Sequence, residues 1–181
     1  MMINFILNCP RTKIWLQKEV IFVMPNVAIG YLLSPIGLIK IKAFDDAIVQ
    51  IDFTEKKDED EKSNPTINKA ISQLEEYFDG KRKEFDLKLS LTGTEFQKIV
   101  WENLLKIPYG SVTSYKELAK KIGKPNAQRA LGSAVGKNPI AIVIPCHRVI
   151  KKDGGIGGYA GGIDRKKWLL EMERNLKIFQ N

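Results

Sequence analysis

Histidine and cysteine are scarce in this sequence, which has one histidine and two cysteines among its 181 residues. So few soft ligands cannot supply a typical structural zinc site, and two distant cysteines are poor evidence for a disulfide framework. We therefore predict no metal site. If Cys146 takes part in catalysis, it must do so through its own thiol, in a reducing compartment.

Long apolar runs are also lacking. None reaches the roughly 18 residues that a membrane-spanning helix needs. The opening stretch MMINFILNCPRTKIW has neither the basic start nor the long apolar core of a signal peptide. We predict a cytoplasmic protein that makes no use of membranes. Patterned sequence begins near Val27, so residues 1–26 are interpreted as a leader that is either disordered or the result of a wrongly assigned start.

Acidic residues are outnumbered: 29 lysines and arginines face 21 aspartates and glutamates, for a net charge of +8. This excess favours a polyanionic partner, with nucleic acid as the first candidate and an anionic membrane as the second. Ordinary lysine-rich proteins show the same excess, so the charge decides little by itself.

Residues 27–91 have the pattern of a small α+β domain. The stretch AIGYLLSPIGLIKIKAF predicts a pair of strands joined at Pro35–Gly37, and AIVQIDF predicts a third strand. Apolar residues over 67–78 recur with helical spacing, and residues 85–89 alternate as in a further strand. This half of the chain offers few candidates for chemistry.

Residues 92–181 form a second, mostly helical domain. Thr94 with Gln97, and Ser114 with Glu117, have the spacing of capping boxes, which start helices. The helix after Ser114 stops at a glycine, and a further helix is expected over 127–135. A short helix, a tight turn and a second helix predict a helix-turn-helix, although many helix pairs share this pattern.

The outward side of the second helix is nearly bare. It carries Arg129 and otherwise the small residues Gly132, Ser133 and Gly136. Glycine is unfavourable inside a helix by about 1 kcal/mol, so its presence needs a reason. A bare face allows close approach to another backbone, which belongs either to a neighbouring helix or to a ligand.

The stretch IVIPCHRVI places Cys146 beside His147, the sole imidazole. A thiol is a strong nucleophile only as thiolate, so a base must take its proton. Adjacent residues of an extended strand point to opposite sides, so this pair needs a bend or a relay. A glycine-rich loop follows around Tyr159, and Asp164 is expected to cap a last helix that carries Glu173. The alternatives are an inert buried cysteine, a flexible loop and a surface glutamate.

These stretches resemble one family. FQKIVWENLLKIPYG, TSYKELA, RALGSAVGKNP, IPCHRVI, GGYAGG and WLLEME occur in the order seen in the O6-alkylguanine-DNA alkyltransferases. The resemblance is strong over residues 92–176 and weak over 28–90. It implies an α+β fold: a small ribonuclease H-like domain, then a winged-helix-like domain with the helix-turn-helix. It also implies a monomer, with no cofactor and no metal, that acts on double-stranded DNA containing O6-alkylguanine.

The resemblance further implies a direct, single-turnover reaction. Cys146 would take the alkyl group from O6 of guanine, and less readily from O4 of thymine. His147 would accept the thiol proton through a water, and Glu173 would orient His147. Tyr115 would donate a proton toward guanine N3. Arg129 would fill the gap left by the flipped nucleotide.

The remaining implied roles concern binding. Asn138 would brace the strand that carries the thiol, and Tyr159 would wall the pocket. Backbone groups at Val149 and Ala160 would meet the guanine edge. The helix face with Gly132 and Ser133 would enter the minor groove. Some family members have serine in place of Ala160, and that difference removes a side-chain hydrogen bond while the backbone N–H stays.

Other functions remain open from the residues alone. A cysteine hydrolase would also use Cys146 and His147 but would turn over. A module that only binds alkylated DNA would not need a reactive thiol. A transcriptional regulator with this helix-turn-helix would prefer one DNA sequence.

Overall fold

The computed structural model describes residues 15–16, 19–20, 27–57 and 59–178. The interpretation of residues 1–26 as a leader therefore lies almost wholly outside the described residues. Within that stretch, β1 (Trp15–Leu16) and β2 (Glu19–Val20) pair in antiparallel fashion.

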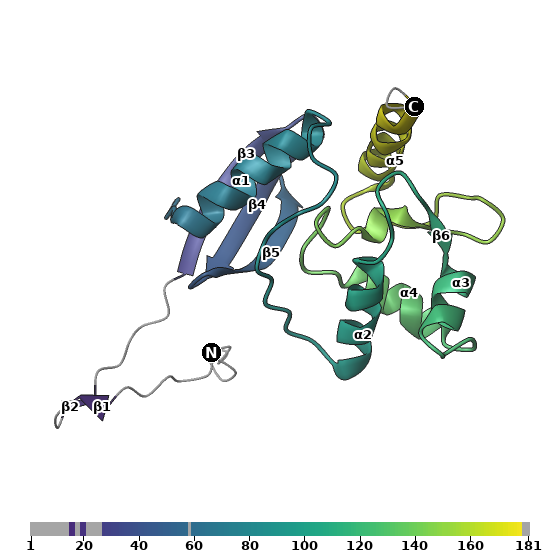
Figure 1. The fold of residues 1–181 in the computed structure, drawn as a ribbon, viewed down its shortest axis with the longest axis horizontal. Coiled ribbons are helices and arrows are strands. Elements are labelled where there is room, and N and C mark those ends of the chain that lie inside the picture. The colour runs from purple at the N-terminus through teal and green to yellow at the C-terminus, as the bar shows by residue number, and fades with distance from the viewer. Residues whose placement is uncertain (1–14, 17–18, 21–26, 58, 179–181) are drawn as a thin grey trace.

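The N-terminal domain is a three-stranded antiparallel sheet in the order β3-β4-β5, with one helix on its face (Figure 1). Its elements are β3 (Val27–Ser34), β4 (Gly37–Phe44), β5 (Ala47–Thr54) and α1 (Pro65–Phe78). Asn64 caps α1 by accepting a hydrogen bond from the backbone N–H of Ile67 at 2.8 Å. The strands and the helix predicted from the hydrophobic pattern are confirmed.

The strand predicted over residues 85–89 is wrong as a regular strand. The segment is extended, yet it pairs with β5 only through a parallel bridge between Leu89 and Ile48. The same edge of β5 also pairs at Ile51 with Ile140, from the C-terminal half of the chain. Because segments from both halves share one short edge, neither builds a continuous ladder.

The C-terminal domain is helical and lies beside the sheet domain (Figure 1). Its helices are α2 (Glu95–Leu104), α3 (Tyr115–Lys121), α4 (Gln128–Gly136) and α5 (Ile163–Ile178). Both predicted capping boxes form, at Thr94 and at Ser114. Gly123, at φ 71°, turns the chain between α3 and α4. These helices form the predicted helix-turn-helix, and α2 packs across α4, where Trp101 Nε1 donates to the Ala134 carbonyl at 2.9 Å.

The cap predicted for the last helix is wrong. Helix α5 begins at Ile163, so Asp164 lies inside its first turn. Gly162 precedes the helix at φ 96°, and its carbonyl accepts the hydrogen bond from the Lys166 N–H at 3.3 Å. A glycine in the left-handed region thus starts the helix without a side-chain cap.

Between these helices lie the short strands β6 (Thr113–Ser114) and β7 (Val149–Ile150), which pair in parallel. A 3₁₀ turn, η1 (Cys146–Arg148), leads directly into β7. The pairing therefore fixes the start of α3 against the end of this turn.

The glycine-rich loop before α5 contacts the N-terminal domain. Arg165 donates from Nε to the Ile36 carbonyl at 2.7 Å and from Nη1 to the Gly161 carbonyl at 2.8 Å. Its guanidinium also lies 4.7 Å from the centroid of the Phe53 ring. Arg165 therefore connects the turn between β3 and β4, at Ile36, to the glycine-rich loop, at Gly161.

Gly161 should not tolerate a side chain. A Cβ added there would lie 2.7 Å from Phe53 Cδ2 and 2.8 Å from Tyr159 Cε1, whereas one added at Gly158 meets nothing within 4 Å. We expect Gly161→Ala to lower the free energy of unfolding by about 1–3 kcal/mol through overpacking. Gly158→Ala, in the same loop, is the control and should change it little. Urea unfolding of both variants checks this, and equal midpoints would contradict the close packing of Gly161.

Candidate active site

Cys146 opens the 3₁₀ turn, which supplies the bend that the sequence requires for an adjacent cysteine and histidine. Its side chain is 6% exposed. Burial raises the pKa of the Cys146 thiol, although the hydrogen bond from Asn138 and the charge of Lys166 act in the opposite direction. The thiol is therefore protonated at neutral pH and needs a base before it can react.

Asn138 holds the chain that leads to this thiol. Its Nδ2 donates to the Ile144 carbonyl at 2.8 Å and to Cys146 Sγ at 3.1 Å, and its Oδ1 accepts from the Ile140 N–H at 3.0 Å. Within the braced turn, Ile142 has φ 71°, an unfavourable conformation for a β-branched residue. The amide of Asn138 thus fixes a strained turn together with the sulfur.

His147 is fully buried and faces Glu173, with 2.9 Å between Nε2 and Oε1. Because a carboxylate only accepts hydrogen bonds, Nε2 carries the proton and Nδ1 presents its lone pair. Nδ1 is buried and has no hydrogen-bond partner among the described residues. Burial lowers the pKa of His147 against the opposing effect of Glu173, so the ring is a neutral base at neutral pH.

Glu173 is 1% exposed and is surrounded by donors. Arg148 donates from Nη2 at 2.8 Å to Oε1 and from Nε at 3.0 Å to Oε2, and the Gly110 N–H reaches Oε2 at 3.0 Å. The Tyr77 hydroxyl donates to Oε1 at 2.7 Å. Burial by itself would raise the pKa of Glu173, but the hydrogen bonds from His147 and Arg148, together with the charge of Arg148, hold it well below its usual range.

The site also contains Tyr77, Arg148 and Lys166, which were not predicted from the sequence. Tyr77 lies on the buried face of α1, and a buried tyrosine hydroxyl usually has a partner, so the pattern indicates a contact without naming it. Lys166 is fully buried in α5, and its Nζ donates to the Val149 carbonyl at 2.6 Å and the Gly158 carbonyl at 3.3 Å. Burial lowers the pKa of Lys166 to about 8, against the opposing effect of Cys146.

The predicted tyrosines lie around the turn. The Tyr159 ring meets His147 edge-on at a centroid distance of 6.5 Å, and its buried hydroxyl has no partner among the described residues. Tyr115 is the first residue of α3, directly after β6, and burial followed by the nearby Cys146 raises its pKa. A Cβ added at Gly157 would lie 3.4 Å from the Tyr115 ring, so the glycine loop passes close to it.

The other predicted pocket residues differ in exposure. Val149 is fully buried, and its carbonyl is occupied by Lys166, whereas Ala160 is exposed. The structure therefore groups Cys146, His147 and Glu173 with Asn138 and the tyrosines, and leaves Ala160 at the surface of the loop.

The bare face of α4 is open. Arg129 and Ser133 are exposed, and a Cβ added at Gly132 or Gly136 would meet nothing within 4 Å. No element of the described chain packs against this face, so the alternative of tight packing against a neighbouring helix is wrong within the described residues.

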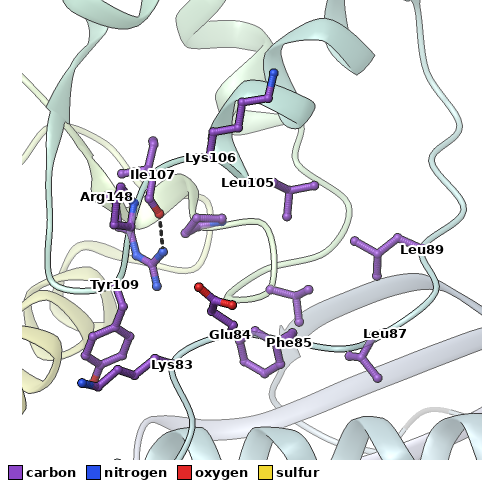
Figure 2. A pocket seen from close by; sticks show the side chains of 13 residues that line it. Lys83, Glu84, Phe85, Leu87, Leu89, Leu105, Lys106, Ile107, Tyr109 and Arg148 are labelled. Atoms are coloured by element: carbon purple, nitrogen blue, oxygen red, sulfur yellow. Dashed lines mark hydrogen bonds between the residues drawn. The ribbon is translucent and has the colours of Figure 1, made fainter.

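A separate pocket of about 530 Å³ lies between the extended segment 83–89 and residues 105–109. Figure 2 shows Arg148 in this pocket, with its hydrogen bond to the Ile107 carbonyl, and Tyr109 beside it. Cys146 is not among the lining residues, so this pocket lies behind the reactive turn and does not open onto the thiol.

Two further features are absent from the described ranges. No cluster of three or more histidine, cysteine, aspartate or glutamate residues there could hold a metal ion. No helix in those ranges combines the length and the apolar character needed to cross a membrane.

Known proteins match both halves of the chain. Residues 27–91 match the family described as "6-O-methylguanine DNA methyltransferase, ribonuclease-like domain", and residues 95–175 match the corresponding "DNA binding domain". These matches confirm the predicted α+β class, with a ribonuclease-like domain followed by a helical DNA-binding domain.

Two individual relatives are similar to the chain over most of their length. The chain is 48% identical over 148 residues to a methylated-DNA–protein-cysteine methyltransferase of Methanosarcina barkeri, covering 78% of this chain and 94% of that one. The Mycolicibacterium paratuberculosis protein of the same name is 47% identical, with 78% and 88% covered.

Solved structures are also similar. The O6-methylguanine methyltransferase of Mycobacterium tuberculosis superposes with a TM-score of 0.75 at 42% identity, covering 85% of this chain and 99% of that one. A structure of the M. tuberculosis protein in complex with DNA gives a TM-score of 0.75 at 44% identity, with 81% and 92% covered.

Stability should fall as the pH drops through the range in which histidine titrates. The pKa of His147 is lowered in the folded protein, so below about 6.5 the unfolded chain binds a proton that the folded chain does not. We expect the free energy of unfolding to decrease from pH 6.5 to pH 5 by up to about 1.4 kcal/mol per pH unit. Chemical denaturation at a series of pH values measures the slope.

Because His147 is the only histidine, His147→Gln is the matched control. It should remove the slope in this window and leave the further loss below about pH 4.5, where the unfolded chain protonates carboxyl groups such as Glu173 that stay ionised in the folded protein. A wild-type curve that is flat between pH 6.5 and pH 5 would contradict a neutral buried imidazole.

Proposed function

Since the chain belongs to the family of methylated-DNA–protein-cysteine methyltransferases, we propose that Cys146 is the cysteine that receives the alkyl group from O6 of guanine. The chain is an enzyme that repairs DNA by moving an alkyl group from the DNA to a cysteine of the protein. The observation that carries the assignment is a set of three buried groups: a protonated Cys146 thiol, the neighbouring neutral His147 imidazole whose Nδ1 has no partner among the described residues, and the Glu173 carboxylate bonded to Nε2.

The reaction begins with the thiol proton. His147 Nδ1 receives it through a water, and Glu173 stabilises the imidazolium that forms. The Cys146 sulfur then attacks the alkyl carbon, and the bond from that carbon to O6 breaks. Tyr115 donates its hydroxyl proton toward guanine N3, so the base leaves neutral and a thioether remains on Cys146. No second nucleophile releases the thioether, so each molecule acts once.

Access to the alkyl carbon requires the nucleotide to leave the duplex. O6 of a paired guanine cannot be reached by a buried thiol, and flipping costs a few kcal/mol. The open face of α4 lies in the minor groove through Gly132 and Ser133, and Arg129 fills the gap in the stack. Asn138, Val149, Tyr159 and Ala160 form the pocket for the flipped base. O4-alkylthymine is a poorer substrate of the same pocket.

The partner is double-stranded DNA, and the net charge of +8 supports its phosphate contacts. One Cys146 site carries out the whole reaction, so the protein acts as a monomer. The minor groove offers a degenerate pattern of donors and acceptors, which suits repair of damage in any sequence.

The proposal predicts a change in the mass of the protein. Incubation with a duplex that holds one O6-methylguanine should add one methyl group, located in the peptide with Cys146. Intact-protein and peptide mass spectrometry measure it. Cys146→Ser should bind the same duplex and gain no mass.

Two outcomes would contradict the proposal. Multiple turnover on an ester substrate, with no mass gain, would indicate a cysteine hydrolase. Tight binding to the damaged duplex, with both the DNA and the wild-type protein unchanged, would indicate a binding module.

A side chain on the open face of α4 should block DNA without harming the fold. Gly132→Leu places its side chain in free space, so the free energy of unfolding should not fall. We expect its affinity for duplex DNA to drop about tenfold or more, equivalent to at least 1.4 kcal/mol, because the helix backbone can no longer approach closely. Fluorescence anisotropy measures the affinity.

The matched control is Ser72→Leu, which adds the same apolar side chain to an exposed position of α1. It should bind DNA as the wild type does. Equal affinity of Gly132→Leu and Ser72→Leu would remove α4 from the interface.

A further inference from the structure

Helix α1 of the N-terminal domain reaches the catalytic carboxylate. Tyr77 is fully buried near the end of α1, and its hydroxyl donates to Glu173 Oε1 at 2.7 Å across 96 positions of sequence. Its ring is held by the rings of Phe78, Phe85 and Tyr109, at centroid distances of 5.5, 5.4 and 6.0 Å. The Tyr77 hydroxyl is therefore positioned by a ring that is packed on several sides.

We propose that Tyr77 is a positioning residue for alkyl transfer: its hydroxyl fixes the Glu173 carboxylate from the other domain and, through Glu173, sets the orientation and proton affinity of His147. This inference rests on the proposed role of His147 as the base. It gives the N-terminal domain a part in the reaction, where its sequence offers no candidate.

The first argument is geometric. Oε1 of Glu173 receives hydrogen bonds from Tyr77, His147 and Arg148, so its lone pairs are fully used. Arg148 belongs to the same turn as His147 and moves with it. Among the described residues, Tyr77 is the one side chain of the N-terminal domain that donates to Glu173. It therefore holds the carboxylate to a frame that is independent of the reactive turn.

The second argument is electrostatic. Burial and the neighbouring carboxylate raise the pKa of Tyr77 well above its usual range, so the hydroxyl stays protonated and presents its positive end to Oε1. This dipole offsets part of the charge with which Glu173 attracts a proton onto His147. Loss of the hydroxyl should therefore raise the pKa of His147.

The other groups around His147 do not replace this effect. Glu173 raises the pKa of His147, whereas burial and the charges of Arg148 and Lys166 lower it. Cys146 adjoins His147, and the ring of Tyr159 meets the imidazole edge-on. Burial and then the charge of Glu173 raise the pKa of Tyr109, but the Tyr109 hydroxyl has no hydrogen-bond partner among the described residues. Among the described residues, Tyr77 alone donates to Oε1 from outside the turn and α5.

The test is Tyr77→Phe, which keeps the ring and removes the hydroxyl. Because the chain has one histidine, an NMR titration of the imidazole reports His147 without ambiguity. We expect the pKa of His147 to rise, and the acid limb of the single-turnover alkyl-transfer rate to move to higher pH with it. On that limb the rate should fall about three- to tenfold more than on the plateau, which corresponds to 0.7–1.4 kcal/mol.

Tyr31→Phe is the matched control. Tyr31 is another buried tyrosine of the N-terminal domain, and its hydroxyl bonds to the backbone at Glu59, away from the site. Loss of the Tyr31 hydroxyl should lower the free energy of unfolding as Tyr77→Phe does. It should leave the titration of His147 and the acid limb of the alkyl-transfer rate unchanged. If Tyr77→Phe behaves like Tyr31→Phe, Tyr77 is merely structural and the inference is overturned.

A second measurement covers the case in which Tyr77→Phe does not fold. Site-specific incorporation of 3-fluorotyrosine at position 77 keeps the size and makes the hydroxyl a stronger donor. The pKa of His147 should then fall, and no change in it would overturn the inference. Failure of the proposed function has a different signature: in the wild type, Cys146 gains no methyl group, or the acid limb does not follow the titration of His147.

Discussion

The buried carboxylate of Glu173 is the constraint on which the rest of the structure depends. A charge at this depth is tolerated only when it is paired and fully hydrogen-bonded. Glu173 meets that demand with donors from α1, from the loop after α2 and from the reactive turn. One carboxylate thereby joins both domains to the turn that carries the thiol, and removing any of its donors would leave charge uncompensated in the interior.

Burial also determines the protonation states of Cys146 and His147 before the reaction. The pKa of the Cys146 thiol is raised and that of His147 is lowered, so both groups are neutral at rest. A neutral thiol reacts slowly with most electrophiles, because the thiolate is the nucleophile. In the proposed reaction, the thiolate forms when the proton moves to His147 and Glu173 stabilises the resulting charge. Low reactivity of the resting thiol protects a single-turnover protein from being consumed by other electrophiles before an alkylated base enters.

Features that depend on neighbouring residues were predictable from the sequence. The capping boxes at Thr94 and Ser114 and the turn at Gly123 are local, and all of them form. Features that depend on distant contacts were not. Residues 85–89 alternate like a strand but share the edge of β5 with Ile140. The start of α5 is the local exception, because Gly162 begins the helix where Asp164 was expected to cap it. The spacing of Tyr77 on α1 is consistent with a core position. Its hydrogen-bond partner Glu173 lies 96 residues away, so the pattern of α1 could not identify that partner.

The two sides of α4 differ in what they contact. Its inward stripe, Leu131, Ala134 and Val135, is buried, and Trp101 bonds to the Ala134 carbonyl. These contacts hold the helix although each interior glycine costs about 1 kcal/mol. The outward side of α4 is therefore not needed for packing against the described residues. No described residue within 4 Å requires glycine there from inside the chain, which supports the proposed approach of DNA to this face.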